Sequence, residues 1–428
     1  MWIPARRCLP TAPSLLVLAV AILALTVLPA CESISGPSNG APPGTPTPIT
    51  ELPRALSLQE EEAIRVGNAF GFELLNRVAE EDREASVFLS PFSATMALGM
   101  ALTGAGGETF EAMSRTLGLE GLDREEILEA YGALLELLVD LDPDVELAIG
   151  NSLWHSDQVA VRDLFRSEIE EYFGARIQGL DFSSPQAAGT INDWVREATR
   201  DRIEEIVDDP IDPNIIAYLI NAVYFKAGWT EVFDPELTRE APFHRLDGRT
   251  ETVELMIRDD TLRHHSTERY DAVDLPYAGG AFSMTVVVPT EGVGVHELAR
   301  EMDAEAWDEL TGSFQTRRAQ IWLPRFELEW DAELDDILIA MGMGPAFQPG
   351  ADFTRIFENA APWIDEVKQK TFVRVDEEGT EAAAVTSVAM PTSLPPQVRA
   401  DRPFLLAIRE RLSGTILFVG LIVEPPRL

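Results

Sequence analysis

The order of helical and strand patterns limits the folds that are open to this chain of 428 residues. The first half carries apolar side chains mainly at helical spacing, in residues 56–82, 86–119 (after a short strand and a turn at Ser90-Pro91) and 125–141, with one strand pattern at 145–156. After a helical pattern at 191–207, strand patterns dominate, in residues 215–229, 251–257, 272–279, 282–290, 318–330 and 371–377. Because no regular β-α-β alternation occurs, the sequence predicts a mixed α+β class with large antiparallel sheets.

Two further patterns complete the C-terminal part. Residues 332–343 have helical spacing, and the glycines at 342 and 344 predict the end of that helix. Residues 402–425 contain two apolar runs around Leu412-Ser413-Gly414. We expect these runs to form a β-hairpin that is buried on both faces.

The first thirty residues resemble a targeting segment. Arg6 and Arg7 precede an apolar run at residues 14–30 that is too short for a typical membrane span. The run ends in Leu28-Pro29-Ala30-Cys31, which resembles the bacterial lipobox, with Pro29 as an unusual occupant. The resemblance implies a signal peptide at 1–30, lipidation of Cys31 and attachment to a membrane at the cell envelope or surface. Ordinary secretion and a retained anchor are the alternatives.

The two cysteines set a second limit. Cys8 lies in the expected signal peptide and Cys31 at the expected lipidation site, so no disulfide framework and no CxxC metal motif are available. Residues 31–56 are rich in Pro, Gly, Ser and Thr, which predicts a tether. Without an internal repeat or a second linker, residues 57–428 are expected to form one domain.

The charge balance excludes some partners. The formal net charge is −38 at pH 7, and only Lys226, Lys368 and Lys370 are lysines. Such a chain repels nucleic acid and anionic lipid headgroups. We interpret the acidic residues as a solvated surface, with a basic ligand or partner as the alternative.

Several separated motifs occur in a characteristic order. They are SVFLSPFSATMALGM (86–100), GAGGETFEAM (104–113), NDWV (192–195) with Thr199, NAVYFKAGW (221–229), LPY (275–277), LPRF (323–326), GADFT (350–354), EEGTEAA (377–383) and Pro403-Phe404. This series resembles the serpin family over nearly all of residues 57–428.

The resemblance implies a fold of three β-sheets with about eight or nine helices and an exposed reactive loop near the C-terminus. It further implies a monomeric inhibitor of serine proteases without a cofactor. In the family, a protease cuts the loop and forms an acyl bond. The cut loop then inserts into the large sheet and carries the protease across the molecule, so each inhibitor acts once.

The residues of the loop fit insertion as a strand. The resemblance assigns the hinge to Glu377, Glu378, Gly379, Thr380, Glu381, Ala382, Ala383 and Ala384. Between Glu381 and Arg399 the chain carries no charge, and the first proline is Pro391. Alternate residues from Thr380 to Met390 would be buried on one face of an inserted strand. Gly379 supplies backbone freedom at the hinge.

The scissile bond has more than one candidate. The family's usual hinge-to-cleavage length places it at Ser393-Leu394, whereas alignment on Pro395-Pro396 places it at Thr392-Ser393. Small uncharged residues at either bond favour elastase-like or subtilisin-like proteases over trypsin-like ones. Met390 is a third candidate, for a chymotrypsin-like protease.

Supporting residues are assigned by the same resemblance. Ser90, Ser93 and Asn221 match the hydrogen-bonded shutter beneath the large sheet, and Trp229 matches the site where the loop enters. The family usually has a histidine where this chain has Gln369, followed as expected by Lys370. A glutamine can still bridge through its amide, but it removes a titratable group.

Other function classes are weaker. Ser90, Ser93, His155, His264 and His265 form no GxSxG, HExxH or S-x-x-K arrangement, so we expect no enzyme. Adjacent histidines on a strand face opposite sides, and GAGGE (104–108) lacks a preceding strand, so neither a metal site nor a phosphate loop is expected. The alternative that stays open is a non-inhibitory lipoprotein that acts as a binding or scaffolding module.

Overall fold

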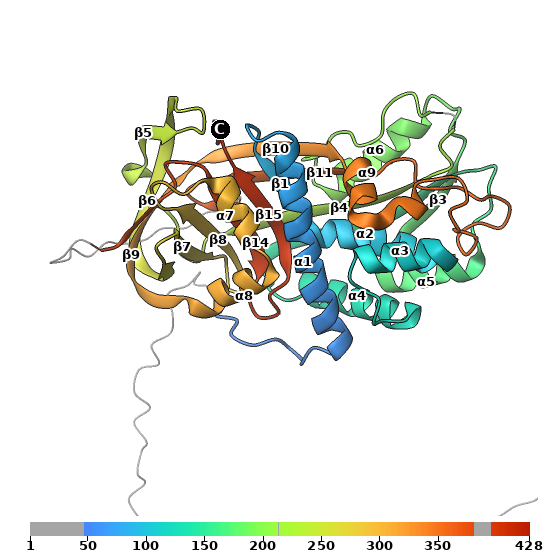
Figure 1. Cartoon of the computed structure of the whole chain (residues 1–428), viewed down its shortest axis with the longest axis horizontal. Helices are drawn as coiled ribbons and strands as arrows, with labels where there is room; N and C mark the ends of the chain where they lie inside the picture. The colour runs from blue at the N-terminus through green and yellow to red at the C-terminus, as the bar shows by residue number, and fades with distance from the viewer. Residues whose placement is uncertain (1–46, 213, 381–394) are drawn as a thin grey trace, which may run out of the picture. The chain divides into compact units, whose positions relative to one another are not determined.

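The computed structural model describes residues 47–212, 214–380 and 395–428. Within these ranges, nine α-helices and fifteen strands follow one another along the chain (Figure 1). The helices are α1 (Leu58–Glu81), α2 (Pro91–Gly104), α3 (Gly107–Thr116), α4 (Arg124–Val139), α5 (Asp163–Phe173), α6 (Ala187–Ala198), α7 (Val295–Glu301), α8 (Ala304–Ser313) and α9 (Asp335–Leu338). The prediction of a mixed α+β protein with helices concentrated in the first half is confirmed.

The strands of the described ranges form three sheets, as expected. The largest has nine strands, in the order β1 (Val87–Leu89), β15 (Ile416–Ile422), β14 (Phe404–Glu410), β8 (Phe282–Pro289), β7 (Tyr270–Pro276), β6 (Thr250–Ser266), β9 (Gln315–Pro324) and β13 (Gln397–Arg399), with β5 (Arg239–His244) paired to β6. β14 and β15 form the predicted C-terminal hairpin, and every residue of both strands is buried.

The other two sheets lie in one layer. A four-stranded sheet has the order β12 (Gly379–Thr380), β4 (Ala217–Gly228), β2 (Val145–Ser156) and β3 (Arg176–Leu180), and a two-stranded sheet consists of β10 (Phe326–Glu333) and β11 (Lys368–Val375). β12 pairs with the end of β4 and also contacts β11. Beyond β12, no ladder joins β4 to β11 among the described residues. We call this unpaired boundary between β4 and β11 the seam.

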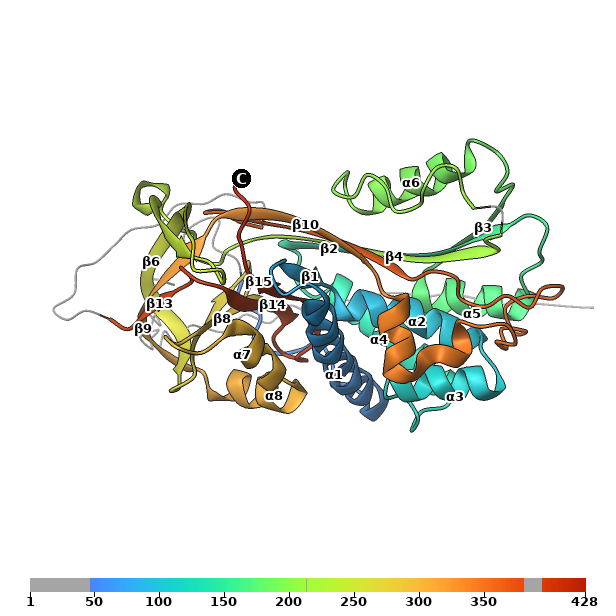
Figure 2. The ribbon, with the colours of Figure 1, turned by 45° about the horizontal axis from the view of Figure 1, so that its top comes forward.

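Helices cover both faces of this layer. Figure 2 shows α6 on one face of β2 and β4, and α1, α2 and α4 on the opposite face. Helix α2 begins at the cap residue Ser90, whose Oγ accepts a hydrogen bond from Ser93 N (3.2 Å), and Pro91 takes the first helical position. Its side chains are apolar on nearly all sides, so the helix is buried between β4 and β15.

One predicted helix is too long. The helical pattern was expected to continue to Val207, but α6 ends at Ala198. Arg200 and Asp201 have positive φ angles of 52° and 61°, which a helix excludes. Asn192 Oδ1 accepts hydrogen bonds from the backbone N–H groups of residues 206 and 207, both at 3.0 Å, and this turns the following segment back along the helix.

Two other predicted elements are interrupted. Residues 318–330 were read as one strand, but Pro324 ends β9, and β10 begins at Phe326 in a different sheet. The helix expected at 332–343 is regular only in α9, and Gly342 leaves helical geometry with φ 114°. Both interruptions occur at Pro or Gly, where the backbone cannot or need not continue the element.

The first described residues contact the folded body. Ile49 N donates to Gly279 O (2.8 Å), and Arg54 Nη2 pairs with Glu60 Oε1 (2.6 Å). Part of the segment expected to be a tether therefore packs on the domain from residue 47 onward. Cys31 lies outside the described residues. Among the helices of the described ranges, none has the length and apolar character needed to cross a membrane.

Candidate functional site

The hinge residues form a tight turn at the end of the seam where β4 finishes. Asp376 Oδ1 accepts hydrogen bonds from Glu378 N (3.1 Å) and Gly379 N (3.3 Å), and Asp376 N donates to Gly379 O (3.1 Å). This turn reverses the chain after β11, so that β12 runs antiparallel to β4, with Gly379 opposite Gly228 and Thr380 opposite Ala227. The described chain therefore stops after two paired residues at one end of the seam.

Glycine is required at position 379. Its φ angle is 143°, and a Cβ there would lie 2.4 Å from Ala227 O and 2.6 Å from Gly228 Cα. Any side chain would break the contact between β12 and β4. Both the backbone conformation and the lack of space thus require glycine at the first paired position of β12.

Trp229 holds the hinge from the side of β4. Its backbone N donates to Glu378 O (3.0 Å), and its indole Nε1 donates to Asp376 O (2.9 Å). The ring is 4% exposed and stacks on Tyr277 with centroids 4.4 Å apart. The structure thus places Trp229 directly against the hinge turn.

Glu377 connects the hinge to two residues that the sequence analysis did not single out. Its Oε1 accepts a hydrogen bond from Thr238 Oγ1 (2.7 Å) and lies 3.6 Å from Arg325 Nη1. Arg325 belongs to the LPRF motif, so its position in that motif was the available signal. The carboxylate is largely buried, which strengthens its attraction to the guanidinium group.

The residues that the resemblance assigns to the shutter form two separate groups of hydrogen bonds at the first turn of α2, one toward β4 and one toward β11. We call these groups the two arms of the shutter. On the β4 side, Ser93 Oγ donates to Asn221 Oδ1, and Asn221 Nδ2 donates to Asn151 Oδ1 (2.5 Å). Asn151 Nδ2 in turn donates to Phe173 O (2.7 Å). Asn151 was not anticipated, because a polar residue inside a predicted strand gives no sequence signal for its partner.

The β11 side is held by Gln369. Its Oε1 accepts from Ser90 N (3.0 Å) and its Nε2 donates to Ser90 O (2.9 Å), while Ser90 Oγ donates to Leu417 O (2.6 Å). Gln369 thus bridges to the backbone of the α2 cap through both polar atoms of its amide. Lys370 does not join this cluster, because its Nζ pairs with Glu329 on β10 (2.6 Å).

The segment after α6 crosses the seam. The Arg202 guanidinium lies 5.2 Å from the ring centroid of Phe372 on β11. Further along, Asp208 pairs with Lys368 (3.2 Å). Burial opposes the charge of Lys368, but the hydrogen bonds that its Nζ donates to the carboxylates of Glu366 and Asp208 outweigh burial and hold the pKa of Lys368 above its usual value. These contacts connect the segment after α6 to β11.

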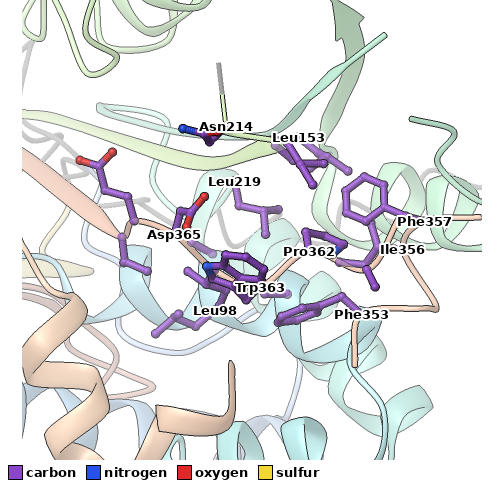
Figure 3. Close-up of a pocket in the computed structure, with 18 residues that line it drawn as sticks. Leu98, Leu153, Asn214, Leu219, Phe353, Ile356, Phe357, Pro362, Trp363 and Asp365 are labelled. Carbon is purple, nitrogen blue, oxygen red and sulfur yellow. The ribbon is translucent and has the colours of Figure 1, made fainter. Parts of the chain in front are cut away.

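A cavity lies at the other end of the seam. It has a volume of about 140 Å³ and is bounded by residues of α2, of β2, of the start of β4 and of the chain that precedes β11. Figure 3 shows Leu98, Leu153, Leu219, Phe353, Ile356 and Phe357 around it, with Pro362, Trp363 and Asp365 on the side of β11. The lining is mainly apolar, so it suits apolar side chains.

Continuing the β12–β4 register reaches this cavity. Gly379 faces Gly228 and Thr380 faces Ala227, so an uninterrupted ladder would place Val388 opposite Leu219 and Met390 opposite Ala217. Leu219 and Ala217 both line the cavity. Directly opposite residues in an antiparallel pair point to the same face. The seam therefore ends in an apolar cavity, which lies where the continued ladder would place Val388 and Met390.

Eight of the residues expected at the loop lie outside the described residues. They are Glu381, Ala382, Ala383, Ala384, Met390, Thr392, Ser393 and Leu394. The described chain resumes before β13, which pairs in parallel with β9 at the edge of the largest sheet. The hinge and β13 therefore fix the two ends of the loop on different sheets.

The residues that the structure describes thus form nine α-helices and three sheets, with a short hinge strand at an unpaired seam, which defines a mixed α+β architecture. A family model described as Serpin (serine protease inhibitor) matches residues 65–425. Iripin-2 of Ixodes ricinus is 33% identical over 378 residues, which cover 85% of this chain and 93% of that protein. The chain therefore belongs to the serpin family.

Solved structures give the same result. The native state of Tengpin, a thermophilic serpin, superposes with a TM-score of 0.79 at 28% identity and covers 89% of this chain and 97% of its own. Human thyroxine-binding globulin, solved with thyroxine, has a TM-score of 0.80 at 27% identity and covers 86% of this chain and 100% of its own. This chain thus shares its fold with a thermophilic serpin and with a thyroxine-binding globulin.

Proposed function

We propose that this serpin inhibits serine proteases by a single-use mechanism in which its loop, once cut, inserts into the seam between β4 and β11. The observation that carries the proposal is the two-residue strand β12. It is already paired with β4, and its register leads along the seam to an apolar cavity. Continued pairing requires no change of direction at the hinge.

The energetics favour insertion after cleavage. Each new ladder hydrogen bond contributes about 1 kcal/mol net, and burial of Val388 and Met390 adds to it. Over roughly ten residues this is comparable to the whole stability of a domain, so it suffices to distort an attached protease. The uncut molecule is then a metastable state that cleavage releases.

The specificity and location belong to the same proposal. We infer cleavage at Ser393-Leu394, or at Thr392-Ser393, by elastase-like or subtilisin-like proteases, with Met390 as the third candidate. The hinge acts through Glu377, Glu378, Gly379, Thr380, Glu381, Ala382, Ala383 and Ala384. Lipidation of Cys31 after a signal peptide at 1–30, as in bacterial lipoproteins, would hold a monomeric inhibitor at the cell envelope or surface.

The test is incubation with subtilisin or an elastase, followed by denaturing electrophoresis. An inhibitor yields a covalent complex that survives boiling in detergent, and mass spectrometry of the released fragment identifies the cut. A product that is only cleaved, with active protease remaining, would contradict the proposal. Intact-mass analysis of the membrane fraction separately tests the lipid on Cys31.

A second candidate is a non-inhibitory binding protein. It is favoured by the 140 Å³ apolar cavity and by the likeness to a globulin that was solved with thyroxine. In this case an apolar small molecule would occupy the cavity of the native protein. Native mass spectrometry of the purified protein, with and without protease cleavage, separates the two candidates, because loop insertion would fill the same space.

A further inference from the structure

The chain that follows the loop is attached to the body by a short strand. β13 has three residues and runs parallel to β9, with Arg399 opposite Trp322. Gln320 N donates to Pro396 O (2.8 Å), and Ala400 N donates to Trp322 O (2.9 Å). One residue further on, Asp401 O accepts from His244 N (2.8 Å). Three residues at a sheet edge provide few backbone hydrogen bonds.

A side-chain cluster adds to this attachment. The guanidinium carbons of Arg399 and Arg239 lie 4.0 Å and 4.2 Å from the ring centroid of Trp322. Trp322 is only 6% exposed, so both cations contact a largely desolvated aromatic ring. Arg399 Nε also pairs with Asp401 Oδ2 (3.0 Å). We call Arg239, Trp322 and Arg399 the Trp322 stack.

The stack joins strands that are not neighbours. Arg239 lies on β5, which pairs with β6, whereas Arg399 lies on β13, which pairs with β9. β6 and β9 pair with each other, so the stack spans four strands from β5 to β13. β13 is thereby held by its pairing with β9 and also, through the Trp322 stack, by contact with β5.

This fastening opposes insertion of an uncut loop. Met390 opposite Ala217 would lie at the far end of β4, about 36 Å from Gly228 at roughly 3.3 Å per residue. Figure 2 shows β13 and β3 on opposite sides of the molecule, and β3 pairs with the part of β2 that lies opposite the first residues of β4. Gln397 follows Met390 by only seven positions, so the chain between their Cα atoms reaches at most about 25 Å. Full insertion without cleavage therefore requires β13 to leave β9.

We propose that the Trp322 stack is the latch that keeps β13 on β9 and so keeps the uncut inhibitor active. The inference rests on the proposed function, since it concerns the lifetime of the metastable state. Trp322, Arg239 and Arg399 are positioning residues in this sense: they hold the leaving side of the loop and take no part in the acyl chemistry. Loss of the stack is expected to accelerate self-insertion of the intact chain.

The experiment compares wild type with Trp322→Leu, Trp322→Phe and Arg399→Gln. Each protein is incubated without protease, and its remaining capacity to form covalent complex is measured over time. We expect Trp322→Leu to lose capacity about tenfold faster than wild type, and Trp322→Phe and Arg399→Gln to lie between them. The inactive fraction should be monomeric, uncut by mass spectrometry and more heat-resistant than the active protein.

Phe110→Leu is the matched control. Arg124 lies 4.6 Å from the Phe110 ring centroid, so this variant removes a cation–π contact far from the loop. If Trp322→Leu and Arg399→Gln decay no faster than this control, or if they lose capacity only by aggregation, the latch proposal is wrong. Arg399→Gln removes a half-buried side chain, so it addresses the latch even if Trp322→Leu does not fold. A wild type that never forms a complex would instead reject the proposed function.

Discussion

The two ends of the loop are attached to the body by different kinds of structure. Before the loop, β12 pairs with β4 over two residues, and we propose that this pairing lengthens after cleavage. After the loop, β13 is a finished edge strand on another sheet, and it is fastened by the Trp322 stack. We expect β12 to gain further pairs with β4 and β13 to stay paired with β9. In our account, cleavage is effective because it separates these two ends.

The largest expected effect comes from a charge at the extending end. Thr380→Arg should lower the ratio of covalent complex to cleaved product about a hundredfold or more. The reason is that an unpaired charge in a strand that enters the sheet costs several kcal/mol. Its partner in the register, Ala227, is 2% exposed. The ratio of complex to cleaved product on denaturing gels measures the effect.

Glu378→Arg is the control for that substitution. Glu378 is exposed and lies in the turn before β12, so the same cation should be tolerated there. Equal losses of complex in both variants would show that the charge acts on the protease encounter and not on insertion.

The next effect concerns the shutter arm on β11. Gln369→Ala removes two buried hydrogen bonds to the backbone of Ser90 and leaves both groups unpaired. We expect the free energy of unfolding of the uncut protein to fall by about 2–4 kcal/mol. Urea unfolding measures it. Gln397→Ala, which removes an exposed amide contact to Gln320, should change it by less than about 0.5 kcal/mol. If Gln369→Ala leaves the free energy of unfolding unchanged, the hydrogen bonds of this arm do not stabilise the uncut protein.

A smaller effect is expected at the far end of the seam. Ala217→Met would place a side chain in the cavity that Met390 is proposed to reach, so the uncut protein should gain about 1 kcal/mol while the rise in melting temperature on cleavage shrinks. Calorimetry of cut and uncut samples gives both values. The same change at Ala241, on β5 in the other sheet, should leave the rise on cleavage unaltered.

The smallest effect is pH dependence. Burial lowers the pKa of His296 and of His264 below the usual value. As the pH falls, these two histidines therefore take up protons at a higher pH in the unfolded chain than in the folded one. The free energy of unfolding should decrease as the pH falls from about 7.5 to 5.5. Gln369 does not titrate, so Gln369→His should add to this decrease. Unfolding midpoints across the range test it, and a midpoint independent of pH in wild type would contradict it.

Much of the fold could be predicted from sequence, because local pattern and motif agree. The apolar runs at 145–156 and 215–229 became β2 and β4, and most of the strand pattern at 371–377 lies in β11. These elements depend on periodicity and on backbone requirements at single residues. Such features are readable without knowing which distant residues they meet.

The remainder depends on contacts between distant residues. The early end of α6 follows from Asn192 binding residues 206 and 207, and the partners of Glu377 come from Thr238 and Arg325. The division of the shutter into two arms is set by which side of α2 each strand approaches. The Trp322 stack requires β5 and β13 to meet across two other strands. Arg325 stands out by its place in the LPRF motif, but no local pattern in the chain shows which distant residues meet in these contacts.

The thermal stability of the chain before and after cleavage at the loop tests the central claim most directly. If the segment after Thr380 continues the β12–β4 ladder to the cavity, the cut molecule should melt at a much higher temperature than the intact one, and hydrogen exchange should show new protection along β4 and β11. Equal melting temperatures, with β4 and β11 exchanging as before, would contradict it.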